Sequence, residues 1–129
     1  MIAAVILKRM LKQADQLDKA FHALADATRR GILERLSEGP ASVSELARPY
    51  RTTLAAIHQH VQVLEASGLI VTEKLGRTRT CSISADAVAR AEQWLSERRG
   101  LWERRFDLLG KLVEDKRLAA RRSRTRKKA

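Results

Sequence analysis

Apolar residues recur at helical spacing through most of the chain, and this pattern predicts a mainly α-helical fold. Within residues 13–25 they fall on one helix face, at Leu17, Ala20, Phe21 and Leu24. Asp26 is then a suitable N-cap for a second helix that runs to about Ser37. A Gly-Pro pair follows at residues 39–40, and such a pair is typical of a helix end.

Two further helices, separated by a short turn, are expected next. Ser42 and Glu45 have the spacing of a capping box, and a proline ends this helix after barely two turns. The longer helix begins near Thr52 or Thr53, either of which can cap it. Its apolar residues have spacings of 3, 4 and 3 and predict a buried stripe of Leu54, Ile57, Val61 and Leu64. A short helix, a turn and a longer helix make a helix-turn-helix.

The other face of the longer helix contains no acidic residue, and most of its side chains can form hydrogen bonds. It consists of Thr53, Ala55, Ala56, His58, Gln59 and Gln62. A buried stripe with a neutral, hydrogen-bonding front suits insertion into a DNA groove. Ordinary surface helices look similar, so this stretch alone leaves both interpretations open.

A β-hairpin is predicted after the longer helix. Two strands with a period of two are expected at residues 69–75 and 78–83, and Gly76 lies at the turn between them. In the first, Leu69, Val71 and Glu73 alternate with Ile70, Thr72 and Lys74; in the second, Arg79, Cys81 and Ile83 alternate with Thr78, Thr80 and Ser82. Lys74, Arg77 and Arg79 lie at the tip and flanks of the hairpin, with little acid near them. A basic hairpin directly after a helix-turn-helix is the wing of a winged helix, which favours the recognition-helix interpretation.

Residues 85–117 return to a helical pattern with a wide apolar stripe. Both tryptophans of the chain lie here, and Gly100 could introduce a kink. The stripe either packs within the chain or meets its copy in a dimer; because it exceeds what the small body could cover, we expect a dimer through the terminal helices. The expected interface residues are Leu17, Phe21, Trp94, Leu95, Leu101, Trp102, Phe106 and Leu109.

The two ends of the chain have their own composition. Residues 1–12 form an amphipathic extension, which could pack on the body, fray or come from upstream sequence added to the domain. It could also lie on a membrane surface, although it is short for that role. Six of the last twelve residues are basic and none is acidic, which predicts a disordered tail that is either solvated or in contact with phosphate. The predicted organisation is an extension at 1–12, a winged-helix body at 13–84, a dimerisation helix at 85–117 and a basic tail at 118–129.

Charge is the most informative property of the composition. The 129 residues contain 26 Lys and Arg against 15 Asp and Glu, a net charge of +11, and the sequence pI is near 10.8. Such a balance favours nucleic acid or anionic membrane as a partner. One cysteine excludes an intramolecular disulfide and a multi-cysteine zinc site. Neither a signal peptide nor a spanning segment is evident, so we expect a cytoplasmic protein with no membrane partner.

The residues resemble the ArsR/SmtB family of bacterial winged-helix repressors from about Leu17 to Leu112. FHALADATRRGILERLSEGPASVSELA is similar to the family's opening helices, HQHVQVLEASGLI to its recognition helix, and EKLGRTRTCSI to its wing. The resemblance implies a homodimer with the terminal helices at its interface. It also implies one recognition helix per protomer in successive major grooves of a palindromic operator.

Several positions depart from the family's pattern. Ala27 stands where a proline is frequent, His58 where a serine is usual, and Gln59 where a lysine or arginine is common. The cysteine pair that many members use for metal sensing is absent from SELARPY, and the last helix contains no histidine. The familiar metal-sensing mechanisms therefore do not transfer. His58 and His60 point about 200° apart on a helix, so they are not expected to hold one metal together. His60 matches a frequent histidine of the family, and the resemblance implies a structural hydrogen-bonding residue at this position.

The expected DNA contacts are the side chains that can reach base edges or phosphates when the recognition helix lies in the major groove. Side chains near the start of the recognition helix read base edges: Thr52, Thr53, Ala56, His58 and Gln59, with Gln62 on the same face. Arg51, Lys74, Arg77 and Arg79 are expected to bind phosphate or the minor groove. The sequence shows neither a phosphate loop nor a catalytic constellation, so we expect no enzyme activity and no cofactor.

These features favour a dimeric, sequence-specific DNA-binding repressor, with an unknown small molecule as a possible inducer. The alternative is a basic architectural or protein-interaction protein of the same fold with little sequence specificity. The two differ in the ratio of operator to random-duplex affinity.

Overall fold

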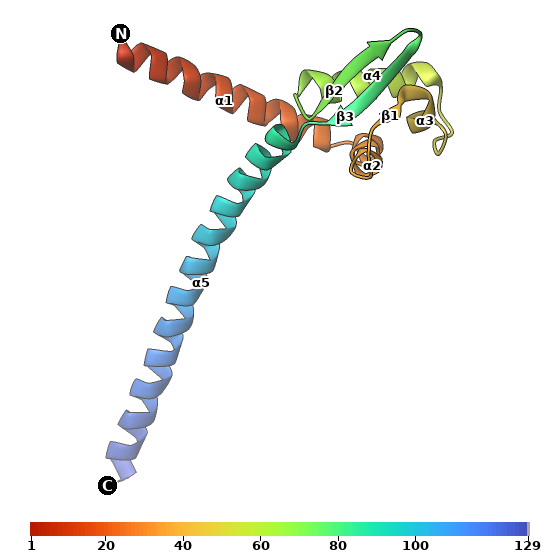
Figure 1. Ribbon diagram of the computed structural model, residues 1–129. Helices are drawn as coiled ribbons and strands as arrows, with labels where there is room; N and C mark the ends of the chain where they lie inside the picture. Colours follow the sequence, from red (N-terminus) through yellow and green to blue (C-terminus); the bar gives the residue numbers. More distant parts are fainter. Residues whose placement is uncertain (129) are drawn as a thin grey trace. The chain divides into compact units, whose positions relative to one another are not determined.

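A computed structural model describes residues 1–128 and contains five helices and one three-stranded sheet in that range (Figure 1). The elements are α1 (Ile2–Leu24), α2 (Ala27–Leu36), β1 (Ala41–Ser42), α3 (Val43–Ala47), α4 (Leu54–Ala66), β2 (Ile70–Leu75), β3 (Thr78–Ile83) and α5 (Ala85–Lys128). This confirms the predicted mainly helical fold with a small β wing. The chain divides into two compact units, Met1–Ala91 and the part of α5 from Glu92 onward.

Helices α2, α3 and α4 begin at the capping residues that the sequence suggests. The Asp26 carboxylate accepts a hydrogen bond from the Arg29 backbone N–H at 3.0 Å, and the Thr53 hydroxyl accepts one from the Ala56 N–H at 3.1 Å. Ser42 caps α3 by accepting the Glu45 N–H at 3.1 Å. Each cap satisfies one of the amides that the first turn of a helix leaves without an intrahelical acceptor.

The sheet has the order β1-β3-β2, and all its pairs are antiparallel. Leu75 pairs with Thr78, so Gly76 and Arg77 form a two-residue turn. Gly76 has a φ of +64°, which is the conformation that a type II′ hairpin turn requires of its first central residue. Strand β1 was not predicted, because two residues are too few to show a periodic pattern.

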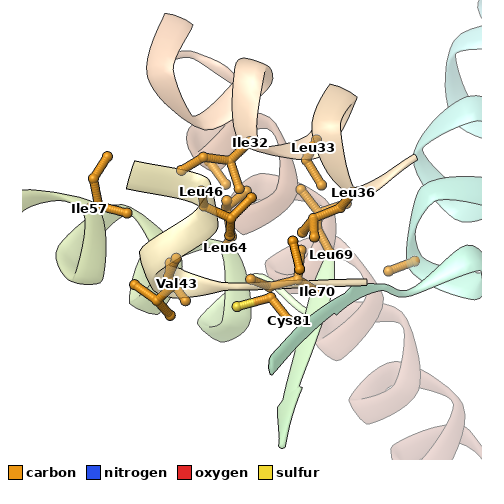
Figure 2. Close-up of a cluster of buried hydrophobic side chains, with 14 of the residues drawn as sticks. Ile32, Leu33, Leu36, Val43, Leu46, Ile57, Leu64, Leu69, Ile70 and Cys81 are labelled. Carbon is orange, nitrogen blue, oxygen red and sulfur yellow. The ribbon is translucent and has the colours of Figure 1, made fainter. Parts of the chain in front are cut away.

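The core of the first unit lies between α2, α3, α4 and the sheet (Figure 2). Ile57 and Leu64 of α4 are fully buried, and Ile32 and Leu46 bring α2 and α3 onto the same cluster. Cys81 of β3 is also fully buried, and burial raises the pKa of its thiol. This packing fixes one side of α4 and leaves its opposite side exposed.

Two features of the helices of the first unit differ from the sequence-based expectations. Leu54 is 49% exposed rather than part of the buried stripe, because it is the first residue of α4 and the core begins one turn later. Residues 1–12 are not a separate segment but the first turns of the continuous helix α1, and their side chains are exposed.

Helix α5 also differs from expectation. It passes through Gly100 and continues to Lys128, whereas the composition predicts a disordered tail from residue 118. The segment is rich in the strong helix formers Ala, Arg and Lys and lacks Gly and Pro, and cations near a helix C-terminus interact favourably with its dipole. No helix among the described residues meets the length and hydropathy needed to cross a bilayer.

Candidate nucleic-acid interface

The exposed side of α4 is defined by the residues opposite its buried stripe. Ile57, Val61 and Leu64 are at most 1% exposed. At 100° per residue, the positions farthest from them are Ala55, Gln59 and Gln62, with Ala66 one turn beyond. All four are exposed. The predicted Gln59 and Gln62 therefore share one outward row, and Ala55 belongs with them although it was missing from the predicted base contacts.

The other predicted base contacts have different environments. Ala56 and His58 lie on opposite flanks of α4 and are half-buried. Thr53 is exposed, but its oxygen is occupied as the cap of α4, which leaves its methyl and its hydroxyl proton for a ligand. Arg51 and Thr52 are exposed in the segment before the helix. The start of α4 thus presents a small, uncharged surface with Arg51 beside it.

The wing carries its basic residues where the sequence predicts them. Arg77 is exposed at the tip, and Lys74 pairs in register with Arg79 across the two strands. Paired residues lie on the same face of an antiparallel ribbon, so Lys74 and Arg79 project from one side. The ribbon lies beside α4 (Figure 1), and α4 packs against β2.

A link between α4 and the wing was not foreseen from the sequence. Glu65 of α4 accepts a hydrogen bond from the Thr72 hydroxyl at 2.9 Å, and its other carboxylate oxygen lies 3.9 Å from an Arg79 guanidinium nitrogen. Arg79 is expected to bind DNA phosphate, but in the structure it already has an acidic neighbour. The pair depends on how the ribbon is placed against α4, and no local sequence pattern signals it.

A second polar cluster attaches α4 to the first two helices. The Arg29 guanidinium donates to the carbonyls of Ala23 at 2.7 Å and His22 at 3.2 Å, and lies 3.3 Å from His60 Nδ1. That ring nitrogen is 3.8 Å from the Asp26 carboxylate. The pKa of Asp26 is lowered, chiefly by the hydrogen bond from the Arg29 amide, and also by the charges of His60 and Arg29. His60 thus has the structural position expected of it, and Arg29 is a support that the sequence did not reveal.

The segment before α4 is held against α2 by Tyr50. Its hydroxyl donates to the Thr28 carbonyl at 3.4 Å. A Cβ at position 31 would overlap this hydroxyl, so Gly31 permits the close approach. Tyr50 directly precedes Arg51 and Thr52, and its anchoring restricts where those residues lie.

The predicted interface residues fall into two groups. Leu17 and Phe21 of α1 are half-buried within the first unit. On α5, the side chains are 37–62% exposed: Trp94, Leu95, Leu101, Trp102, Phe106 and Leu109. The rings of Trp102 and Phe106 are 5.8 Å apart. Within the described residues, no group of three or more His, Cys, Asp and Glu side chains is arranged to hold a metal ion.

Comparisons with known proteins agree with this geometry. The family described as "Helix-turn-helix domain" matches residues 24–73. HTH-type transcriptional regulator Rv2034 of Mycobacterium tuberculosis is 40% identical over 72 residues, which cover 56% of this chain and 67% of that protein. That alignment accounts for two thirds of the relative, and the helix-turn-helix match contains the whole of α4.

Solved structures extend the match. A crystal structure of an ArsR family transcriptional regulator is 51% identical, with a TM-score of 0.65, covering 68% of this chain and 97% of that one. The homodimeric winged helix-turn-helix domain of Mb0332 from Mycobacterium bovis is 24% identical, with a TM-score of 0.58, covering 72% and 88%, and shares the fold. The chain therefore belongs to the ArsR family of winged helix-turn-helix transcriptional regulators, and its helix-turn-helix is a DNA-binding domain.

Proposed function

We propose that this regulator is a homodimeric repressor that binds a palindromic operator through α4 and the wing. The observation that carries the proposal is the outward row of Ala55, Gln59 and Gln62 on α4, together with the exposed basic tip of the hairpin that packs against this helix. A glutamine can pair bidentately with adenine, and an alanine methyl can contact the thymine methyl. Arg51, Lys74 and Arg77 hold the protein on the phosphates, which positions the reading row without specifying sequence.

The homodimer forms through α5. Leu95, Trp102, Phe106 and Leu109 lie within a narrow arc of this helix and are each more than half exposed. An exposed apolar row of this length is typical of a protein interface. A twofold dimer presents two copies of α4, so the operator carries two half-sites related by the same symmetry. The related Mb0332 domain is homodimeric.

The regulatory signal does not act through the metal sites familiar in the family. The cysteine pair is absent from the α3 region, and α5 contains no histidine. An unidentified small molecule fits the proposal as an inducer, provided that it binds the free and the DNA-bound states with different affinity. The architectural alternative differs from the repressor in sequence specificity, so an experiment that measures specificity distinguishes the two functions.

The test is to select an operator from random-sequence duplexes with the full chain, and then to compete it against random duplex at fixed salt. Gln59→Ala is expected to weaken operator binding by about 1–3 kcal/mol while leaving random-duplex affinity nearly unchanged. Gln13→Ala, at an exposed position of α1, is the matched control and is expected to leave both affinities unchanged. A wild-type operator preference near one supports the architectural alternative, whereas a clear preference that Gln59→Ala leaves intact contradicts the proposed reading row.

A further inference from the structure

The charge of α5 changes abruptly along its length. Residues 85–115 contain six basic and seven acidic residues, so this part of the helix is almost neutral. Residues 116–128 contain eight basic residues and no acidic one. The first part has the charge balance of an ordinary exposed helix, and the second has that of a polyanion-binding segment.

The basic residues surround the helix instead of forming one face. At 100° per residue, Lys116, Arg117, Arg121 and Arg124 lie within one broad arc, while Arg122 and Arg126 point to the other side. The side chains described between residues 116 and 126 are all exposed, and the last acidic residue before them is Asp115. The segment therefore carries dense positive charge that no acidic residue of its own sequence neutralises.

This arrangement distinguishes between two polyanions. A helix that lies on an anionic membrane needs an apolar face to bury among the lipids. Leu118 is the only large apolar residue from 116 to 126, and arginines stand on both sides of the helix. A nucleic-acid backbone requires only positive charge and hydrogen-bond donors, which arginine supplies as a planar fork suited to phosphate.

We propose that the C-terminal part of α5, from Lys116 to Arg126, is a second DNA-binding surface that contacts the phosphates of duplex DNA without reading sequence. It adds electrostatic affinity that operator and random DNA share equally. The winged helix then supplies the difference in affinity between operator and random sequences. This surface is independent of base reading by α4, so it would operate whether or not the operator proposal holds.

The experiment compares two full-length variants that lose the same charge from the same helix. Arg121→Gln, Arg122→Gln and Arg124→Gln are combined in the tail variant, and Arg90→Gln, Arg99→Gln and Arg104→Gln in the control. Binding of each to random-sequence duplex is measured by fluorescence anisotropy between about 50 and about 200 mM salt. Circular dichroism verifies that helix content is retained.

The tail variant is expected to bind random duplex more weakly, with a salt slope reduced by about 0.9 for each phosphate that it no longer neutralises, and the control is expected to keep the wild-type slope. The tail variant is expected to keep the wild-type preference for operator over random duplex, and this separates its result from a failure of operator reading. An unchanged slope in the tail variant, or an equal loss in both variants, overturns the proposal. So does a tail variant that binds DNA normally but loses binding to phosphatidylglycerol vesicles, since that result assigns the surface to membrane.

Discussion

The two units differ in the exposure of their apolar side chains. In the first unit, Ile57 and Leu64 of α4 are fully buried against the neighbouring helices and the sheet. In the second, Trp102 and Phe106 of α5 are 56% and 62% exposed. Burial of apolar surface is the main source of folding free energy. The first unit therefore obtains its stability from its own contacts, whereas the exposed apolar surface of α5 would yield free energy when a second chain covers it in the proposed dimer.

Polar interactions differ between the units in the same sense. In the first unit, the Arg29 guanidinium donates to the carbonyls of Ala23 and His22 and lies 3.3 Å from His60 Nδ1, so it joins α1, α2 and α4. On α5, pairs such as Arg99 with Glu103, at 3.8 Å, join successive turns of one exposed helix. Such pairs contribute a few tenths of a kcal/mol. The helical conformation of α5 is thus supported locally, and in the proposed dimer its tertiary contacts would come from association.

The largest effect is expected from a cavity in the body. Leu64→Ala removes a fully buried side chain from the centre of the core and should lower the free energy of unfolding by about 2–5 kcal/mol, measured by urea denaturation. Leu54→Ala is the matched control on the same helix, because Leu54 is 49% exposed, and it should change stability far less. Equal losses in the two variants would show that the packing of α4 differs from that described.

A smaller effect, on association instead of folding, is expected on α5. Trp102→Ala removes a large exposed aromatic from the proposed interface, and tryptophans in such places commonly contribute about 2 kcal/mol or more. The dimer dissociation constant, measured by analytical ultracentrifugation, should rise at least about tenfold while the helix content stays the same. Arg104→Ala is the control on this helix. A dimer that tolerates Trp102→Ala would place the interface elsewhere.

The sequence predicted the fold well where the signals are local. The caps at Asp26, Ser42 and Thr53 depend on residues three apart, and the buried stripe of α4 repeats over several turns. Strand β1 has two residues and no period to detect, and it exists because β3 offers a free edge. The disordered tail expected from charge is wrong for the end of α5, because Ala, Arg and Lys are strong helix formers and the helix continues to Lys128.

The candidate site was predicted less completely, because its details depend on tertiary placement. The exposed row of α4 follows from helix periodicity once the buried stripe is known, although the predicted base contacts include neither Ala55 nor Ala66. The pairing of Glu65 with Arg79 requires the ribbon to lie against α4, and that of Arg29 with His60 brings together residues 31 positions apart. Charges that look alike in a sequence therefore divide into those available to DNA and those already engaged.

The smallest expected effect comes from Glu65→Gln, which tests whether Arg79 is engaged by Glu65 or available to DNA. Glu65→Gln keeps an oxygen that can accept the Thr72 hydroxyl but removes the negative charge beside Arg79. Stability should change by less than about 1 kcal/mol, because the pair is exposed. With Arg79 released to phosphate, the affinity for random duplex should increase and the salt slope should steepen by up to about 0.9 for each additional phosphate neutralised, measured by fluorescence anisotropy.

Glu97→Gln is the matched control, since Glu97 also lies 3.9 Å from an arginine, Arg98, but on α5. It should leave the affinity for DNA unchanged if DNA is bound by the winged helix and the far end of α5, away from this pair. An equal gain in both variants would mean that only net charge matters and that Glu65 has no special place beside the DNA. A gain confined to Glu65→Gln would show that two ion pairs of the same length differ in effect, because one restrains a wing residue that can reach phosphate.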